Sequence, residues 1–287
     1  MPVYHALSPA KINFTLEVAG RRPDGFHDLR MLMQTVSLSD ILAVSIEPGH
    51  LFVSLRSSLP GLSTDQNNLA VRAALFFLET ARIQASVSII LDKQIPVGAG
   101  LGGGSSNAAC VLKVLNEHFH FPLEDDRMAA LALRLGSDVP FFLRGGLQYA
   151  EGRGERLTPL PPLPPCTLVL CKPDYPVSTA QAFSRYAHRQ SGSLCPLTAQ
   201  ALQAVRHNDL SALGQVLFNQ LETALSQSQQ ADQAAISAVF KTRGAVGDML
   251  SGSGPTRFGL FLDGTSAQNA AASLSEQWNS VFITQPV

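Results

Sequence analysis

The sequence predicts an α+β protein built as two domains, and three observations support this prediction. The chain has 287 residues, close to the size at which one hydrophobic core tends to divide into two. Short segments with the two-residue periodicity of strands alternate with longer segments of helical periodicity. The proline-dense stretch at 159–165 cannot lie inside a helix or a central strand. We expect it to connect an N-terminal domain at 1–158 to a C-terminal domain at 159–287; a proline-rich recognition motif is the alternative interpretation.

Composition and charge exclude several classes of protein. Apolar residues make up 45% of the chain, which is too many for a disordered protein. The formal net charge is −1, which argues against binding nucleic acid by overall charge, although a local basic site remains compatible with it. The N-terminus lacks the basic start and apolar run of a signal peptide, and no apolar stretch reaches the roughly 20 residues of a membrane span. We therefore expect a cytoplasmic protein without membrane or nucleic-acid partners.

The cysteines and histidines predict no metal site. The four cysteines form no C-x-x-C pair, so free thiols are expected in place of zinc ligands or disulfides. The histidines include no H-E-x-x-H motif, and the close pair His118 and His120 is typical of a helix end.

In the N-terminal domain, residues 12–18 alternate strictly between apolar and polar types, which predicts a half-buried strand. Thr64 or Asp65 is expected to cap the first helix, and Gly136 to end the third. The further expected strands are at 31–38, 41–46, 51–55 and 86–91, and the expected helices are at 66–82, 105–119 and 124–135.

In the C-terminal domain, strands and packing helices again alternate, which suggests an α+β sandwich. The expected strands are at 167–171, 245–250, 258–262 and 279–284, and the expected helices are at 179–190, 198–206, 209–225, 229–243 and 266–277.

The most informative segment is the glycine-rich loop Pro96-Val97-Gly98-Ala99-Gly100-Leu101-Gly102-Gly103-Gly104-Ser105-Ser106-Asn107. Its glycines have no side chains to pack, but they allow positive φ and let backbone N–H groups turn to one side. An amphipathic helix follows directly. Free N–H groups and the helix dipole both favour an anion there, so the loop predicts a phosphate site. The serine hydroxyls are candidates to cap the helix, bond phosphate or contact a metal ion; a tight turn with a serine cap is the simpler alternative.

Other phosphate-binding motifs fit this loop poorly. A Walker loop requires a lysine after the last glycine, and none follows. Gly98, Gly100 and Gly103 match the G-x-G-x-x-G spacing of a dinucleotide site, but the preceding strand ends near Leu91 and the acidic residues at 124–126 open a helix instead of ending a second strand. A protein kinase would also need H-R-D and D-F-G motifs, which this sequence lacks.

Three further features suit phosphoryl transfer, which needs positive charge near the moving phosphate and a group that deprotonates the nucleophile. Lys11 lies at the start of the first strand and shares a polar face with Asn13. Asp138 follows a helix stop and is flanked by apolar residues and proline, so partial burial is expected. The stretch 251–256 is longer and more polar than a tight hairpin requires. Alone, each has a simpler interpretation: a solvated lysine, a turn aspartate and a loop.

Taken together, these segments resemble the GHMP kinases, whose members include galactokinase, homoserine kinase and mevalonate kinase. The shared motifs are Pro9-Ala10-Lys11-Ile12-Asn13, the loop 96–109 and the glycine turn 251–256. Segments 20–27, 68–73 and 136–142 are similar to the branch that uses ATP to phosphorylate the C2 hydroxyl of 4-diphosphocytidyl-2-C-methyl-D-erythritol in the non-mevalonate isoprenoid pathway. The resemblance runs from about residue 8 to residue 262. It implies an N-terminal half like domain 2 of ribosomal protein S5 and a ferredoxin-like C-terminal half.

The resemblance also implies roles for residues of this chain. Lys11 and Asp138 match the catalytic pair: the aspartate takes the proton of the C2 hydroxyl, and the lysine holds that hydroxyl and the phosphate. Residues 96–106 match the triphosphate-binding loop, and Asn68 lies in a motif near the adenine. The implied substrate contacts are Asn13, Phe26, His27 and Phe183, with Tyr186 and Tyr175 as alternatives to Phe183.

Two positions depart from the family pattern. Phe26 replaces the usual tyrosine, so its ring is able to stack on cytosine but the phenol hydroxyl is lost. Arg257 occupies a position where an apolar strand residue is expected. No carboxylate cluster suggests a dedicated metal cage, so Mg²⁺ is expected to be carried with ATP, with Ser105 or Ser106 as a candidate ligand.

Two competing functions are weighed against this one. A different GHMP kinase, acting on mevalonate or homoserine, would share the loop and the catalytic pair. A non-catalytic RNA-binding protein would share the N-terminal architecture but should show a basic stripe with interleaved aromatic residues, which this sequence does not contain.

Overall fold

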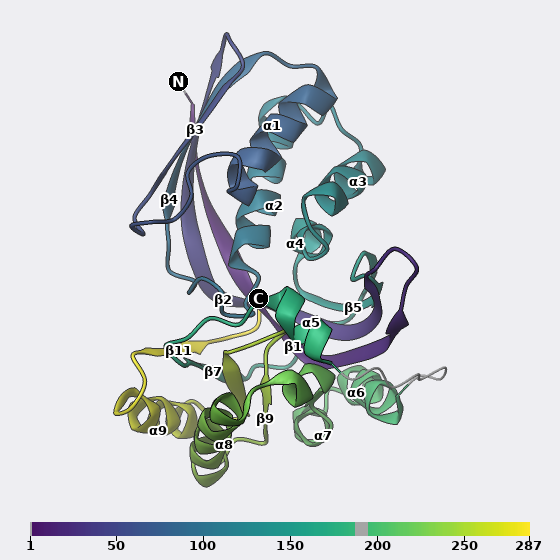
Figure 1. The fold of residues 1–287 in the computed structure, drawn as a ribbon, viewed down its shortest axis with the longest axis vertical. Coiled ribbons are helices and arrows are strands. Elements are labelled where there is room, and N and C mark those ends of the chain that lie inside the picture. Colours follow the sequence, from purple (N-terminus) through teal and green to yellow (C-terminus); the bar gives the residue numbers. More distant parts are fainter. Residues whose placement is uncertain (1, 187–194) are drawn as a thin grey trace. The chain divides into compact units, whose positions relative to one another are not determined.

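The computed structural model describes residues 2–186 and 195–287, which form two compact units (Figure 1). Unit 1 comprises Met1–Ala10, Ser39–Ile95 and Gly102–Arg144, and unit 2 comprises Lys11–Leu38, Pro96–Leu101 and Gly145–Val287. The long strands β1 (Val3–Arg21) and β2 (His27–Pro48) each contribute to both units. The units thus interleave along the chain, while the expected functional division after residue 158 stays a prediction.

Unit 1 is a sheet with helices on one face. Strand β4 (Ala85–Asp92) pairs antiparallel with residues 41–48 of β2 and parallel with β3 (Phe52–Ser57). Alternate residues of these strands are buried, among them Val44, Ile46 and Val87, so one face of the sheet carries the core. The helices of this unit, which Figure 1 shows on the same side of the strands, are α1 (Leu69–Ala81), α2 (Gly103–His118), α3 (Asp125–Leu135) and α4 (Val139–Arg144).

Unit 2 contains a four-stranded antiparallel sheet in the order β11-β7-β10-β9. The strands are β7 (Thr167–Lys172), β9 (Gly247–Leu250), β10 (Arg257–Phe261) and β11 (Ser280–Thr284). Helices α8 (Gln227–Thr242) and α9 (Gly264–Ser275) pack on it around Ile236, Phe240 and Leu274, which are fully buried. Burial of each such side chain contributes about 1.5–3 kcal/mol. The order of strands and helices is ferredoxin-like, as expected.

The remaining elements of unit 2 lie beside β1 and β2. Residues 29–34 of β2 pair with β5 (Leu147–Gly152), which forms a hairpin with β6 (Arg156–Pro159). The two-residue strand β8 (Phe218–Asn219) pairs parallel with Thr15 and Leu16 of β1. The helical elements are α5 (Thr179–Arg185), α6 (Pro196–Arg206), α7 (Leu210–Gln215) and the 3₁₀ turn η1 (Gln220–Ala224).

Most of the predicted helices and strands are confirmed, but three predictions are wrong. The strands expected at 31–38 and 41–46 form one continuous strand, β2. The helix expected at 209–225 is broken: α7 ends at Gln215, and Phe218 and Asn219 pair with β1 as strand β8. Asn68, not Thr64 or Asp65, caps α1. The helix expected at 179–190 is observed as α5, and residues 187–190 lie outside the described residues.

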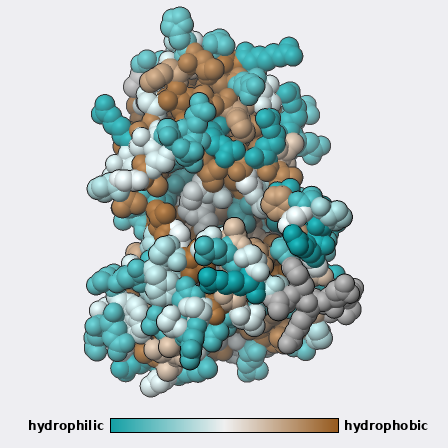
Figure 2. Space-filling view, viewed as in Figure 1, coloured by the Kyte–Doolittle hydropathy of each residue, from teal (hydrophilic) through white to brown (hydrophobic). Residues whose placement is uncertain are grey.

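Three elements were not expected from the sequence: α4, β5 and β6. In the part of the chain that the structure describes, no helix combines the length and apolar character that crossing a membrane requires. Figure 2 shows hydrophilic and hydrophobic residues interspersed on the visible face, with the hydrophobic ones most evident over unit 1. A mixed surface of this kind is ordinary for a globular protein.

Candidate active site

The glycine-rich loop has an unusual backbone conformation. Gly98, Gly100 and Gly102 have φ values of +65°, +76° and +71°. At Gly100 a Cβ would lie 2.2 Å from the carbonyl oxygen of Ser251, so no other residue fits there. Alternating left-handed residues turn successive N–H groups toward one side, which creates an anion-binding concavity.

The carbonyl groups of the loop are engaged by other parts of the protein. Five successive carbonyl oxygens, those of residues 98–102, all accept hydrogen bonds from within the protein. In unit 2 the donors are Val177 N (3.5 Å), Thr256 N (3.3 Å), Ser251 Oγ (3.1 Å) and Lys11 N (2.9 Å), to Gly98, Ala99, Gly100 and Leu101 in turn. In unit 1, Ser106 N donates to Gly102 O at 2.9 Å. Among the described residues, these carbonyls are bonded to protein donors while the N–H groups of 98–102 bond to no other backbone group, so the N–H groups are left to serve an anion.

The loop leads directly into α2. This helix begins at Gly103, two residues earlier than expected, and its N-cap is Gly102. Gly102 has no side chain, and no other side chain among the described residues caps the start of this helix. The first N–H groups of α2 thus remain available to an anion. Ser105 is half-buried, whereas Ser106 is buried and its hydroxyl accepts a hydrogen bond from Ser8 at 2.8 Å.

The glycine turn 251–256 lies against the loop residues of its own unit. Gly252 has φ +56°, and a Cβ there would lie 3.1 Å from both Gly100 O and Lys11 Nζ. The buried side chain of Asn219 holds the turn: its Nδ2 donates to Leu250 O (2.8 Å) and Gly252 O (2.7 Å). The turn is therefore the neighbour of the loop and of Lys11.

Arg257 also has a structural explanation. Its Nε donates to Asp248, and its NH1 donates to Glu222 at 3.0 Å. Glu222 also accepts a hydrogen bond from Leu250 N at 2.9 Å. The arginine thus ties β10 to β9 and η1 directly below the glycine turn.

Lys11 and Asn13 form a buried pair on β1. The Lys11 side chain is only 4% exposed, and its Nζ donates to Asn13 Oδ1 at 2.6 Å. The Nδ2 of Asn13 lies 3.5 Å from the sulfur of Met31. A buried lysine is expensive to desolvate, so its position between the glycine loop and the glycine turn indicates a role beyond stability.

Asp138 belongs to unit 1 and immediately precedes α4. It is half-buried, in line with the burial expected from its apolar neighbours. Pro140 lies in the first turn of α4, where its missing N–H is not needed for a helical hydrogen bond. A short buried helix therefore fixes the backbone that follows the carboxylate.

The side chains that the family resemblance links to the cytosine belong to unit 2. His27 stacks on Phe183, with centroids 5.0 Å apart and planes 20° from parallel. Phe26 is 47% exposed, and the guanidinium carbon of Arg153 lies 3.6 Å above its ring. Of the alternatives to Phe183, Tyr186 is buried and donates its hydroxyl to Gln220. Phe183 is thus the aromatic residue placed beside His27.

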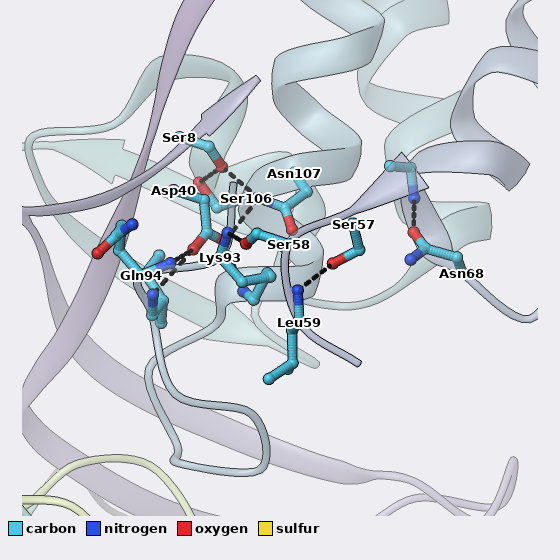
Figure 3. Close-up of polar contacts among 12 residues, drawn as sticks. Ser8, Asp40, Ser57, Ser58, Leu59, Asn68, Lys93, Gln94, Ser106 and Asn107 are labelled. Carbon is cyan, nitrogen blue, oxygen red and sulfur yellow. Dashed lines mark hydrogen bonds and ion pairs between the residues drawn. The ribbon is translucent and has the colours of Figure 1, made fainter. Parts of the chain in front are cut away.

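Asn68 is engaged in local structure within unit 1. Its Oδ1 accepts from Ala70 N at 2.9 Å as the cap of α1, and its Nδ2 donates to Ser63 O at 2.8 Å. Figure 3 shows this cap alongside a second cluster of polar side chains built around Asp40 and Lys93. That cluster was not expected from the sequence, because Ser39-Asp40 reads as a break between two strands.

The described residues contain no group of three or more His, Cys, Asp and Glu side chains arranged to hold a metal ion. Burial raises the pKa of the thiols of Cys110 and Cys166 to about 11 and that of Cys171 to about 12. These cysteines are therefore protonated, which makes them poor metal ligands and poor nucleophiles at neutral pH.

Comparison with known proteins places the chain in a family. Residues 68–146 match the model of the GHMP kinases N terminal domain, and residues 201–280 match that of the GHMP kinases C terminal domain. A 4-diphosphocytidyl-2-C-methyl-D-erythritol kinase of Clostridium botulinum is 37% identical over 278 residues, which cover 97% of this chain and 98% of the relative. The chain belongs to the 4-diphosphocytidyl-2-C-methyl-D-erythritol kinase family. The enzyme of that name from Clostridium beijerinckii is 36% identical over 278 residues, again covering 97% of this chain and 98% of the relative.

Solved structures agree with membership of this kinase family. A crystal structure of 4-(cytidine 5'-diphospho)-2C-methyl-D-erythritol kinase has a TM-score of 0.81 and 35% identity and covers 99% of both chains. A homoserine kinase from Cytophaga hutchinsonii has a TM-score of 0.78 at 18% identity, covering 100% of this chain and 95% of its own. The second match shows the shared GHMP kinase fold alone.

Proposed function

We propose that this protein transfers the γ-phosphoryl group of ATP to the C2 hydroxyl of 4-diphosphocytidyl-2-C-methyl-D-erythritol, as a step in non-mevalonate isoprenoid precursor synthesis. It is then a phosphotransferase with an alcohol acceptor, and its substrate is a small molecule. The observation that carries the phosphate-binding part is the loop at 98–102, in which every carbonyl faces a protein donor. The membership of the chain in the kinase family supports the choice of acceptor.

In this proposal Asp138 and Lys11 perform the proton and charge chemistry. The Asp138 carboxylate takes the proton of the C2 hydroxyl, and the freed oxygen attacks the γ-phosphorus of ATP. The bond between that phosphorus and the β–γ bridging oxygen breaks, and ADP leaves with the electron pair. Lys11 stabilises the negative charge on the transferred group, and its amine is already oriented by Asn13.

The loop 96–106 and the start of α2 bind the triphosphate in this proposal. The N–H groups of the loop and the positive end of the helix dipole supply the attraction, so the chain needs few cations. Asn68 lies near the adenine. Mg²⁺ carried with ATP would offset the phosphate charge, and Ser105 would be the better protein candidate to contact it, because the Ser106 hydroxyl is buried against Ser8.

We assign the cytidine end of the substrate to Phe26, His27 and Phe183. His27 is held by its stacking on Phe183, and the exposed ring of Phe26 offers a face for the base. Phe26 lacks the phenol hydroxyl of the usual tyrosine, and its ring makes a cation–π contact with Arg153.

A phosphorylation assay tests the proposed acceptor. The protein should consume ATP with 4-diphosphocytidyl-2-C-methyl-D-erythritol and form a product phosphorylated at C2, with little turnover of mevalonate or homoserine. Turnover of mevalonate alone would overturn the choice of acceptor, and salt-sensitive RNA binding without phosphoryl transfer would favour the non-catalytic alternative.

Replacement of Asp138 tests the mechanism. Asp138→Ala should lower kcat at least about a hundredfold, because a general base contributes roughly 10²–10⁴ to rate. Asp126→Ala, at an exposed aspartate of α3 in the same unit, is the matched control and should retain near-normal kcat. Near-normal turnover in Asp138→Ala would remove the assigned role.

A further inference from the structure

We propose that Asp40 is a positioning residue that fixes both ends of the glycine-rich loop and thereby sets the affinity for the nucleotide. The proposal rests on the function proposed above, in which this loop binds the phosphates of ATP. Asp40 lies on β2, 0% exposed, on the same inward face as Leu42 and Val44. A carboxylate there would be strongly disfavoured without partners.

Four donors of unit 1 converge on this carboxylate (Figure 3). Its Oδ1 accepts the backbone N–H groups of Gln94 and Ile95, each at 2.8 Å. Its Oδ2 accepts from Lys93 Nζ at 2.5 Å and from Asn107 Nδ2 at 2.9 Å. Both carboxylate oxygens are thus satisfied, and the donors come from two stretches of chain that are distant in sequence from β2.

Those two stretches are the entrance and the exit of the loop. Gln94 and Ile95 immediately precede Pro96, and Asn107 immediately follows Ser106. One carboxylate therefore holds together the two ends of the segment 96–106. Fixing the ends of a flexible loop removes conformations that binding would otherwise have to exclude, so the loop N–H groups are pre-organised for an anion.

The exit is held by a second layer of hydrogen bonds. The same Asn107 Nδ2 also donates to Ser8 Oγ at 2.9 Å, and Ser8 Oγ donates to Ser106 Oγ at 2.8 Å. Residues 106 and 107 lie in the first turn of α2, so this layer sets the direction in which the helix start points. Ser8 is 0% exposed, and its contact with this turn is therefore shielded from water.

The ion pair between Asp40 and Lys93 also lies next to the exit of the loop. The side chains of Lys93 and Asp40 are 6% and 0% exposed, and a Cβ at Gly103 would lie 3.2 Å from Lys93 Nζ. The ammonium thus lies against the first residue of α2. Buried ion pairs are often no more stabilising than apolar residues of the same size. The pair is better explained by placement of the loop ends than by stability.

The test compares two buried carboxylates. Asp40→Asn keeps the shape but removes the charge and one acceptor oxygen. Glu17→Gln is the matched control: Glu17 is also 0% exposed, but it pairs with Arg30 and accepts from Thr198 of α6, in unit 2. Both variants should lower the melting temperature. Titration calorimetry with Mg²⁺ and a non-hydrolysable ATP analogue then measures Kd, and steady-state assays separate KM for ATP from kcat.

We expect Asp40→Asn to raise Kd and KM for ATP about tenfold, the size expected for lost hydrogen bonds to a charged group, with kcat at saturating ATP reduced much less. Amide hydrogen exchange should accelerate in residues 94–107. Glu17→Gln should leave Kd within about twofold of the unmodified protein. The proposal would be overturned if Asp40→Asn lowers the melting temperature as much as Glu17→Gln does but leaves Kd and the amide hydrogen exchange of residues 94–107 unchanged.

If Asp40→Asn does not fold, a milder variant tests whether this hydrogen-bond network sets the affinity for the nucleotide. Ser8→Ala removes only the outer layer of hydrogen bonds and should raise Kd about threefold, the effect of roughly one neutral hydrogen bond. An unchanged Kd in a folded Ser8→Ala protein would count against the proposal. Failure of the unmodified protein to bind the analogue would instead overturn the proposed function, so the two failures are distinguishable.

Discussion

The two glycine-rich segments of this chain are fixed by side chains of opposite chemistry. The ends of the loop 96–106 are held by a carboxylate, Asp40, which accepts N–H donors that lie outside the loop. The turn 251–256 is held by an amide, Asn219, which donates to two carbonyl oxygens. Neither side chain bonds to an N–H group inside the glycine segment that it holds, although Gly254 N donates to Ser251 O within the turn. The loop shows how a chain of net charge −1 can provide an anion site from its backbone.

The two arrangements differ in the free-energy cost of burying the side chain and in the effect of losing it. Asp40 and Lys93 bury charge, whereas Asn219 buries only a neutral amide whose oxygen also accepts from Leu221 N at 2.9 Å. Loss of a neutral amide leaves unsatisfied carbonyls, but loss of one charged partner leaves an uncompensated ion. We therefore expect the loop to be more sensitive to charge changes, and the turn more sensitive to geometry.

The largest effect should come from the point where loop and turn meet within unit 2. Gly100→Ala places a methyl group against Ser251 O and forces a left-handed residue, so kcat/KM should fall at least about a hundredfold. Gly61→Ala is the control: Gly61 has φ +78° but no atom within 4 Å of the added Cβ. It should cost only about 1 kcal/mol of stability. Similar activity losses in both variants would show that strain alone, not the loop–turn contact, is responsible.

A second effect concerns the amide that holds the turn. Asn219→Asp places a carboxylate opposite two carbonyl oxygens, so kcat/KM should fall about tenfold and the free energy of unfolding by about 3 kcal/mol. Asn208→Asp, at an exposed left-handed position of the same unit, is the control and should change neither by much. Full activity of Asn219→Asp would show that the turn does not depend on this amide.

A third effect separates the turn from the strands beneath it. Arg257→Met removes the partner of the buried Asp248 and should lower the free energy of unfolding by about 2–3 kcal/mol, measured by urea denaturation. The double variant Arg257→Met, Asp248→Leu should recover most of that loss, since no unpaired charge remains. A double variant as unstable as the single one would mean that Arg257 acts through Glu222 instead.

The smallest expected effect is on the reactivity of one buried thiol in each unit, which reports local rigidity. Cys110 lies on α2 in unit 1, and Cys171 lies on β7 in unit 2; burial raises the pKa of the two thiols to about 11 and about 12. At pH 8 both should react with a thiol reagent far more slowly than the half-buried Cys195. Selective acceleration at Cys110 in Asp40→Asn would show that the carboxylate holds α2 in place, whereas equal acceleration at Cys171 would indicate general loosening.

Local sequence was sufficient for much of the fold. The periodicity of 86–91 and the glycine boundary at 136 predicted β4 and α3, because these signals act over a few residues. The ferredoxin-like arrangement was expected from the family resemblance. The continuity of β2 and the break at 209–225 were not predictable in this way. Asp40 is accommodated in a strand only because donors 54 and 67 residues away reach it. The expected helix stops at Gln215, and Phe218 and Asn219 pair instead with a part of β1 that is distant in the sequence.

For the candidate site the division is similar. The glycines before a helix, Lys11 and Asp138 can be identified directly in the sequence, and the order of the motifs carries the resemblance to a kinase family. Three features appear only in the folded chain: the carbonyls of residues 98–102 are occupied, Phe183 stacks on His27, and Asp40 and Asn219 hold the two glycine segments. The physical reason is that hydrogen bonds and ring contacts between distant residues depend on distance in space, which periodicity along the chain does not encode.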